Sequence, residues 1–291
     1  MTSSLKRWPL AGLMVAVSAL MLAACGSSKK SAKPTKVAIS ISEAGKSAKY
    51  TVPTSIKGGL VNLAVTNTAK APHSAQLVLI QGNHTTQEAL KIISSNSNKT
   101  PSWLHAEGGA GQVAPGVSVT ADVNLPAGKY VVGDFLGGPG SSGPPGFAEF
   151  RATAGKNGSL PTTSTTVTAA TAGKDRYAWK ISGSLKPGAN SITFKSEGKD
   201  ALHFIGAFRV TGKPSKAEIL KFLSSNGNGP PPKFVDQGSF DNTAILDGGK
   251  SQTTQLHLSK PGTYVLFCPV TDRNGGKSHD HEGLLKTIQV K

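Results

Sequence analysis

Methionine, cysteine and enzyme motifs are all scarce in this chain of 291 residues. Its three methionines, Met1, Met14 and Met21, all lie within the first 25 residues. The two cysteines are Cys25 and Cys268, so no disulfide can form within the chain if Cys25 is modified. The sequence has no GxSxG, no HExxH and no phosphate-binding loop. These absences exclude the common hydrolase, zinc protease and nucleotide-binding classes.

Acidic residues are also few, 16 against 32 lysines and arginines. Without residues 1–25 the basic count falls to 30, which leaves a formal charge of +14. No dense basic run contains interleaved aromatic residues, so we expect no nucleic-acid partner. The charge instead favours anionic lipid headgroups or envelope polymers, or it serves solubility alone.

The N-terminus is typical of an export signal. Lys6 and Arg7 precede the apolar stretch Pro9–Ala24, which is too short to span a bilayer comfortably. Leu22-Ala-Ala-Cys25 resembles the lipobox of bacterial lipoproteins, in which the cysteine is acylated. We therefore predict a signal at residues 1–25, lipidation of Cys25 and a flexible basic tether at 26–36. The protein would then be anchored on the extracytoplasmic face of the cell membrane. The alternative is an ordinary secretory signal with a chance cysteine.

One segment occurs twice, at residues 80–98 and 210–228, with an offset of 130. His73 in the first copy matches His203 in the second, and Cys268 stands where the first copy has Asp134. Only the second copy adds histidines, His279 and His281, before its final strand. One scaffold is therefore present twice, and only the second carries soft metal ligands. We expect His73 to be structural, and His84, His105 and His257 to be surface residues.

The strand pattern predicts an all-β chain with two tandem Greek-key β-sandwich domains, at residues 37–151 and 176–291. Alternating segments separated by Gly and Pro turns mark the strands, and a Ser/Thr-rich linker is predicted at 152–175. One helix is inserted in each domain, where Thr85–Glu88 and Ser215–Glu218 form capping boxes. Gly227 or the Asn-rich run beside it would end the second helix. The expected strands are 49–52, 60–66, 74–80, 117–124, 129–132, 148–153, 177–182, 190–195, 202–210, 253–258, 263–267 and 284–290.

A copper site of the blue type needs two imidazoles and one thiolate in a plane. His203 on a strand, Cys268 at a strand end and His279 before the last strand fit this layout. With Pro261-Gly-Thr-Tyr264 and His279–Leu284, they make the chain resemble the cupredoxin family, the plastocyanin- and azurin-like domains. The resemblance implies equatorial ligands at His203, Cys268 and His279, with Leu284 in the axial position but not coordinating. His281 is the alternative ligand.

The chain departs from the family pattern in two ways. Residues 269–278 make a longer loop than the family usually has, and Asp272–Lys277 within it looks mobile. A leucine in the axial position should raise the potential, because loss of axial donation destabilises copper(II) more than copper(I).

We therefore expect a lipid-anchored protein that binds one copper ion in its second domain, for electron transfer or copper handling, with a redox partner protein. The first domain would be a spacer. Multicopper oxidases need several His-X-His pairs, and this chain has one, His279-Asp-His281. We therefore predict that the protein is not an enzyme. The alternative is a metal-free β-sandwich module for adhesion or envelope interaction, with a buried and inert Cys268.

Overall fold

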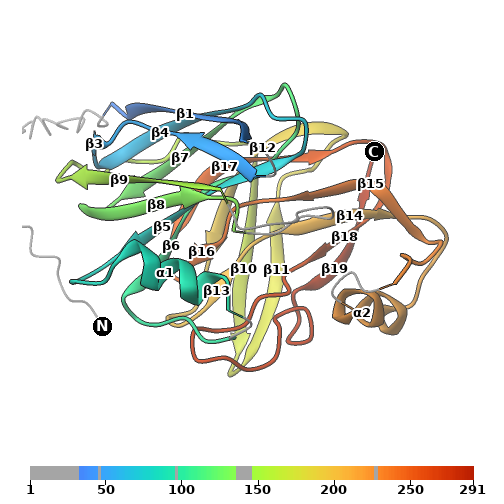
Figure 1. The fold of residues 1–291 in the computed structure, drawn as a ribbon. Helices are drawn as coiled ribbons and strands as arrows, with labels where there is room; N and C mark the ends of the chain where they lie inside the picture. The colour runs from blue at the N-terminus through green and yellow to red at the C-terminus, as the bar shows by residue number, and fades with distance from the viewer. Residues whose placement is uncertain (1–32, 45–46, 96–97, 136–145, 226–228) are drawn as a thin grey trace, which may run out of the picture. The chain divides into compact units, whose positions relative to one another are not determined.

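The computed structural model describes residues 33–44, 47–95, 98–135, 146–225 and 229–291 (Figure 1). The predicted signal at 1–25, Cys25 and most of the tether lie outside these residues, as does Gly227. All described residues belong to one compact unit, Ser31–Lys291. No helix among them is long and apolar enough to cross a membrane.

The first repeat folds as two facing sheets. The chain crosses repeatedly between them, as in a Greek key, and β1 pairs in parallel with β4. Leu63, Leu77 and Tyr130 are fully buried between the sheets. One sheet has the order β2 (Ser47–Thr51), β1 (Thr35–Ala44), β4 (Gly59–Asn67) and β7 (Ser118–Leu125). The other has β6 (Leu104–Val113), β5 (His73–Ile80), β8 (Gly128–Gly133), β9 (Phe147–Thr153) and β3 (Ser55–Lys57).

The second repeat has the same plan. Ile192, Tyr264 and Leu266 fill its core. One sheet has the order β11 (Arg176–Ser182), β10 (Thr165–Gly173), β12 (Gly188–Ser196) and β17 (Ser251–Leu258). The other has β15 (Val235–Asn242), β14 (Gly206–Val210), β18 (Gly262–Phe267) and β19 (Leu285–Val290). Two short strands, β13 (Leu202–His203) and β16 (Leu246–Asp247), pair with each other. The prediction of tandem β-sandwiches is confirmed.

Each repeat carries one helix, α1 (Thr86–Ile93) or α2 (Lys216–Ser224), as predicted. In both helices the N-cap hydroxyl accepts from the N3 backbone amide while the N3 glutamate accepts from the N-cap amide. Ala89 and Ile219 are the buried residues of their helices. The two capping boxes therefore fix where each insertion begins.

The segment 152–175 differs from the linker that the sequence predicts. It contains β10, which pairs in parallel with β12 and antiparallel with β11. Thr165 at its start lies 130 residues after Thr35 at the start of β1, the same offset as the repeat. Val167 and Ala169 are fully buried in the second core. The sequence did not predict this strand because its inward-facing residues are small, so the alternation of large apolar residues that marks a strand is missing. Where each domain begins and ends stays a prediction.

The predicted strand at 202–210 is interrupted. It forms β13 and β14, with Phe204 and Ile205 between them. The Ile205 amide donates to the Thr243 hydroxyl at 3.0 Å instead of to a sheet partner. His203 therefore stands on a short strand of its own, at the edge of the second core.

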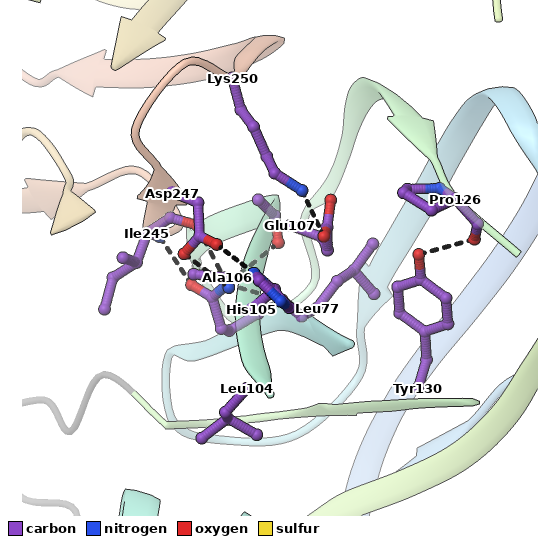
Figure 2. Close-up of polar contacts among 12 residues, drawn as sticks. Leu77, Leu104, His105, Ala106, Glu107, Pro126, Tyr130, Ile245, Asp247 and Lys250 are labelled. Carbon is purple, nitrogen blue, oxygen red and sulfur yellow. Dashed lines mark hydrogen bonds and ion pairs between the residues drawn. The ribbon is translucent and has the colours of Figure 1, made fainter. Parts of the chain in front are cut away.

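The two repeats join edge to edge. β17 meets β7 at Thr253 and Asp122, and β16 meets β6 at Leu246 and Glu107. Figure 2 shows the polar contacts at the second junction, where Lys250 reaches Glu107. The Gln76 side chain also bonds the backbone of Ile245 there. The two sandwiches therefore share a hydrogen-bonded junction.

Candidate metal centre

Three of the predicted ligands lie together in the second repeat. Cys268 follows β18, His279 precedes β19 and His203 stands on β13. All three residues are 0% exposed. The Cys268 sulfur lies 3.8 Å from Nδ1 of His279, and the rings of His203 and His279 have centroids 4.5 Å apart. The fold thus gathers one thiol and two imidazoles, from three separate segments, in one buried cluster.

Backbone hydrogen bonds bring the ends of the 269–278 loop back together. The Cys268 amide donates to the Leu284 carbonyl at 3.1 Å, and the Leu284 amide donates to the His279 carbonyl at 2.7 Å. The Asp280 amide donates to the Cys268 carbonyl at 2.8 Å. Gly283 has a φ of 122°, and a Cβ there would lie 2.1 Å from the Tyr177 carbonyl oxygen. Only glycine permits this close turn before β19.

Asp272 sets the orientation of the His279 ring. Its Oδ1 atom accepts from Nε2 of His279 at 3.1 Å and from the Tyr177 hydroxyl at 2.9 Å. Because Nε2 carries the proton, the lone pair of the neutral ring is on Nδ1, which faces Cys268. The Tyr177 ring lies 4.6 Å from the His279 ring and 4.7 Å from the His203 ring. Asp272 and Tyr177 therefore contact the histidines of the cluster, although no sequence motif predicted either residue.

His203 leaves one nitrogen without a partner. Its Nδ1 atom lies 3.0 Å from the Ser196 hydroxyl oxygen, and that hydroxyl lies 3.3 Å from the Leu246 carbonyl, to which it donates. Ser196 then accepts from Nδ1–H, and the His203 lone pair is on Nε2. This Nε2 atom is buried and has no hydrogen-bond partner among the described residues. A buried polar atom without a partner calls for an explanation, and an absent ion is one.

Burial controls the protonation of the cluster. It lowers the pKa of His203 to about 3, helped by the neighbouring His279. It also lowers the pKa of His279, although Asp272 opposes the shift. Burial raises the pKa of the Cys268 thiol to about 12, against the backbone amides of Phe204 and Val270. Both imidazoles are therefore neutral and able to donate a lone pair, while Cys268 is a thiol that a metal must deprotonate.

The cluster is not closed around a common point. Among the described residues, no group of three His, Cys, Asp or Glu side chains is arranged to hold a metal ion. Cys268 contacts His279, and His279 contacts His203, so the contacts run as a chain. The residues present fit a soft ion by donor type, by protonation state and by the unpartnered Nε2.

The other two predicted site residues lie differently. Leu284 is fully buried in the same apolar cluster as Cys268, and its axial position stays a prediction. The His281 side chain is 39% exposed, and its Nδ1 contacts Asp280 at 2.8 Å and Ser278 at 3.1 Å. His281 is thus not brought into the buried cluster.

The first repeat has an ion pair at the matching positions. Nδ1 of His73 lies 2.8 Å from Asp134, whose other oxygen accepts from the Ser74 hydroxyl at 2.8 Å. The aspartate that replaces the cysteine gives the histidine a carboxylate partner. This ion pair is consistent with a structural His73, which stays a prediction. His105, expected on the surface, is only partly exposed at 22%, and its Nδ1 bonds Asp247 of the second repeat at 2.8 Å.

No family model and no curated protein sequence matches the chain. The similar solved structures are cupredoxin-fold proteins. Reduced auracyanin from Roseiflexus castenholzii is 24% identical, covering 45% of this chain and 99% of its own, with a TM-score of 0.30. The copper nitrite reductase of Nitrosomonas europaea is 13% identical, covering 89% and 94%, with a TM-score of 0.24. A blue copper oxidase from the same organism is 17% identical, covering 88% and 85%, with a TM-score of 0.21. Likeness at these identities shows the fold alone, and proteins of this fold include both enzymes and non-enzymes.

One prediction is corrected by these comparisons. We predicted that the protein is not an enzyme. The similar structures include oxidases and a nitrite reductase, which are enzymes, beside the auracyanins. The absence of further His-X-His pairs therefore does not exclude an enzyme.

Proposed function

We propose that the second repeat binds one copper ion through His203, Cys268 and His279 and takes part in electron transfer or copper handling. The observation that supports this most is the burial of a thiol and two neutral imidazoles in one contact chain, with Nε2 of His203 left without a partner. A buried nitrogen without a partner is costly, and a bound metal ion would satisfy it.

The residues divide the work of such a site. Bound copper would supply a one-electron couple between its two oxidation states. His279 would donate its Nδ1 lone pair, since Asp272 holds the proton on Nε2. Cys268 would bind as the thiolate and release its proton. Leu284 would present an apolar side chain beside Cys268 and exclude water. The buried setting would favour copper(I), the less charged state.

Two neighbouring histidines provide the sharpest test. His279→Ala removes a buried donor, whereas His281→Ala removes a half-exposed imidazole two residues later. Copper(II) is added to the chain and to both variants, and the thiolate-to-copper absorption is followed. We expect the band to be lost in His279→Ala and kept in His281→Ala. The reverse result would assign the ligand to His281, and an equal loss would assign a site to both.

The location is a second part of the proposal. We propose that the protein is lipid-anchored through Cys25 on the extracytoplasmic face, with a redox partner protein or anionic envelope polymers as its contacts. The support is the small-residue pair before Cys25 and the basic tether after it. We expect Cys25→Ser to leave the protein unprocessed or to release it from the membrane fraction. Mass spectrometry that finds the mature N-terminus at another residue would exclude the anchor.

A further inference from the structure

The loop between Cys268 and His279 is held on both of its sides. We expected Asp272–Lys277 to be mobile, yet the adjacent residues Asp272 and Arg273 make contacts in opposite directions. Asp272 bonds His279 and Tyr177 inside the second repeat. Arg273 bonds the first repeat. The loop therefore connects the candidate metal centre to the other sandwich.

Arg273 is the main link to the first repeat. Its Nη1 atom donates to the carbonyl of Leu104 at 2.7 Å and to that of Pro101 at 3.0 Å. Its Nη2 atom donates to Asp247. The Arg273 side chain is 11% exposed, so these bonds are largely shielded from water. A guanidinium group can serve three acceptors in fixed directions, whereas a lysine ammonium cannot hold that geometry.

Asp247 belongs to the same link. It also accepts from His105 at 2.8 Å and from the backbone amide of Ala106 at 3.0 Å, and both donors lie in the first repeat (Figure 2). Its side chain is 7% exposed. One buried carboxylate of the second repeat thus joins Arg273 to β6 of the first. The negative charge of Asp247 compensates the positive charge of Arg273, and a buried cation requires such a partner.

Other groups of the 269–278 loop also bond the first repeat. The Arg273 carbonyl accepts from the Thr100 amide at 2.8 Å, and the Thr271 hydroxyl donates to the Asn98 carbonyl at 2.9 Å. The Arg273 amide donates to the Asp200 carbonyl at 2.8 Å. Segment 98–105 of the first repeat therefore contacts the loop on either side of Asp272.

We propose that the first repeat clamps the loop that precedes His279, with Arg273 as the positioning residue. By fixing Arg273, the clamp places the adjacent Asp272, and Asp272 keeps Nδ1 of His279 toward Cys268. The inference rests on the proposed metal site, because only a ligand role gives this orientation a purpose. It assigns the first repeat a task beyond that of a spacer, which explains how a ligand loop of this length keeps a defined shape.

The test uses the full chain without metal and then with copper(II). Arg273→Ala removes the link, and Thr271→Val removes one hydroxyl bond while keeping the side-chain shape. Arg209→Ala is the matched control, since Arg209 pairs with Asp236 and bonds the Pro261 carbonyl within the second repeat. Amide hydrogen exchange of residues 269–279 and the imidazole nitrogen shifts of His279 are measured by NMR.

We expect exchange in residues 269–279 to rise about tenfold in Arg273→Ala, less in Thr271→Val and not in Arg209→Ala. The His279 shifts should move toward a mixture of tautomers in Arg273→Ala alone. Copper affinity should fall about 10–100-fold in the same variant, the usual effect of losing a positioning contact. Unchanged exchange and unchanged His279 shifts in Arg273→Ala would overturn the clamp. A natural chain that binds no copper would overturn the proposed function, while the metal-free measurements would still decide the clamp.

Discussion

The bond network of Asp272 gives the most detailed prediction, for the variant Asp272→Ala. Oδ1 of Asp272 accepts from Tyr177 at 2.9 Å and from His279 at 3.1 Å. His279 is 0% exposed and Tyr177 is 8% exposed, so both donors lose their partner in a buried place. The Asp272 side chain itself is 27% exposed, so water can enter the space that alanine leaves.

The cost follows from these exposures. A buried donor without a partner costs about 1–3 kcal/mol, and partial access of water favours the lower half of that range for each group. Since two donors are affected, we expect Asp272→Ala to lower the free energy of unfolding by about 2–4 kcal/mol. Asp272→Asn keeps an acceptor oxygen and loses only the charge, so its cost should stay below about 1 kcal/mol.

Denaturant unfolding of the metal-free natural chain and both variants measures these differences. The nitrogen shifts of His279 supply a second measure, since loss of the Nε2 acceptor should allow the proton to move to Nδ1. If the alanine variant is as stable as the natural chain and its His279 tautomer is unchanged, Asp272 does not orient the ring. The reasoning about the cluster would then be wrong.

Two further predictions concern buried charges elsewhere. Burial raises the pKa of Asp241 to about 7 from 3.8, so the folded chain keeps a proton that the unfolded chain loses, and stability falls as pH rises through that interval. The free energy of unfolding of Asp241→Asn, relative to that of the natural chain, should therefore rise by up to about 4 kcal/mol between pH 4 and pH 8. A difference in denaturant unfolding that does not change with pH would refute this. Lys250 pairs with Glu107, whose side chain is 1% exposed, so Lys250→Met should leave a buried carboxylate alone and cost about 3–5 kcal/mol. Lys250→Met with Glu107→Gln should recover most of that loss in the same assay, and no recovery would show that the pair is not the cause.

The sequence predicted the features that repeat or alternate. Both helices begin at the predicted capping boxes. The strand that carries Trp179 and the strand that ends just before Cys268 lie where large apolar residues gather. β10 was missed because Val167 and Ala169 are small and stand among threonines. The repeat offset of 130 places β10 opposite β1, so a comparison of the two copies could have predicted this strand.

The surroundings of the candidate site were beyond such reasoning. Cys268 and His279 could be proposed from a familiar order of ligands, and the structure brings them within 3.8 Å. Asp272 and Arg273 looked like parts of a mobile loop because their partners lie far away in the chain. Arg273 meets Leu104, 169 residues before it, and only the packing of two sandwiches creates that contact. A loop is fixed by what it touches, which its own composition does not reveal.

Copper(II) titration of the natural chain beside Cys268→Ser tests the central claim most directly. Cys268 is buried and unpaired, so it is the sulfur that a copper ion in this cluster would bind. The account predicts an intense visible band that saturates at about one equivalent of copper and is absent from the serine variant. A natural chain without the band, or a band of equal strength in Cys268→Ser, would contradict it.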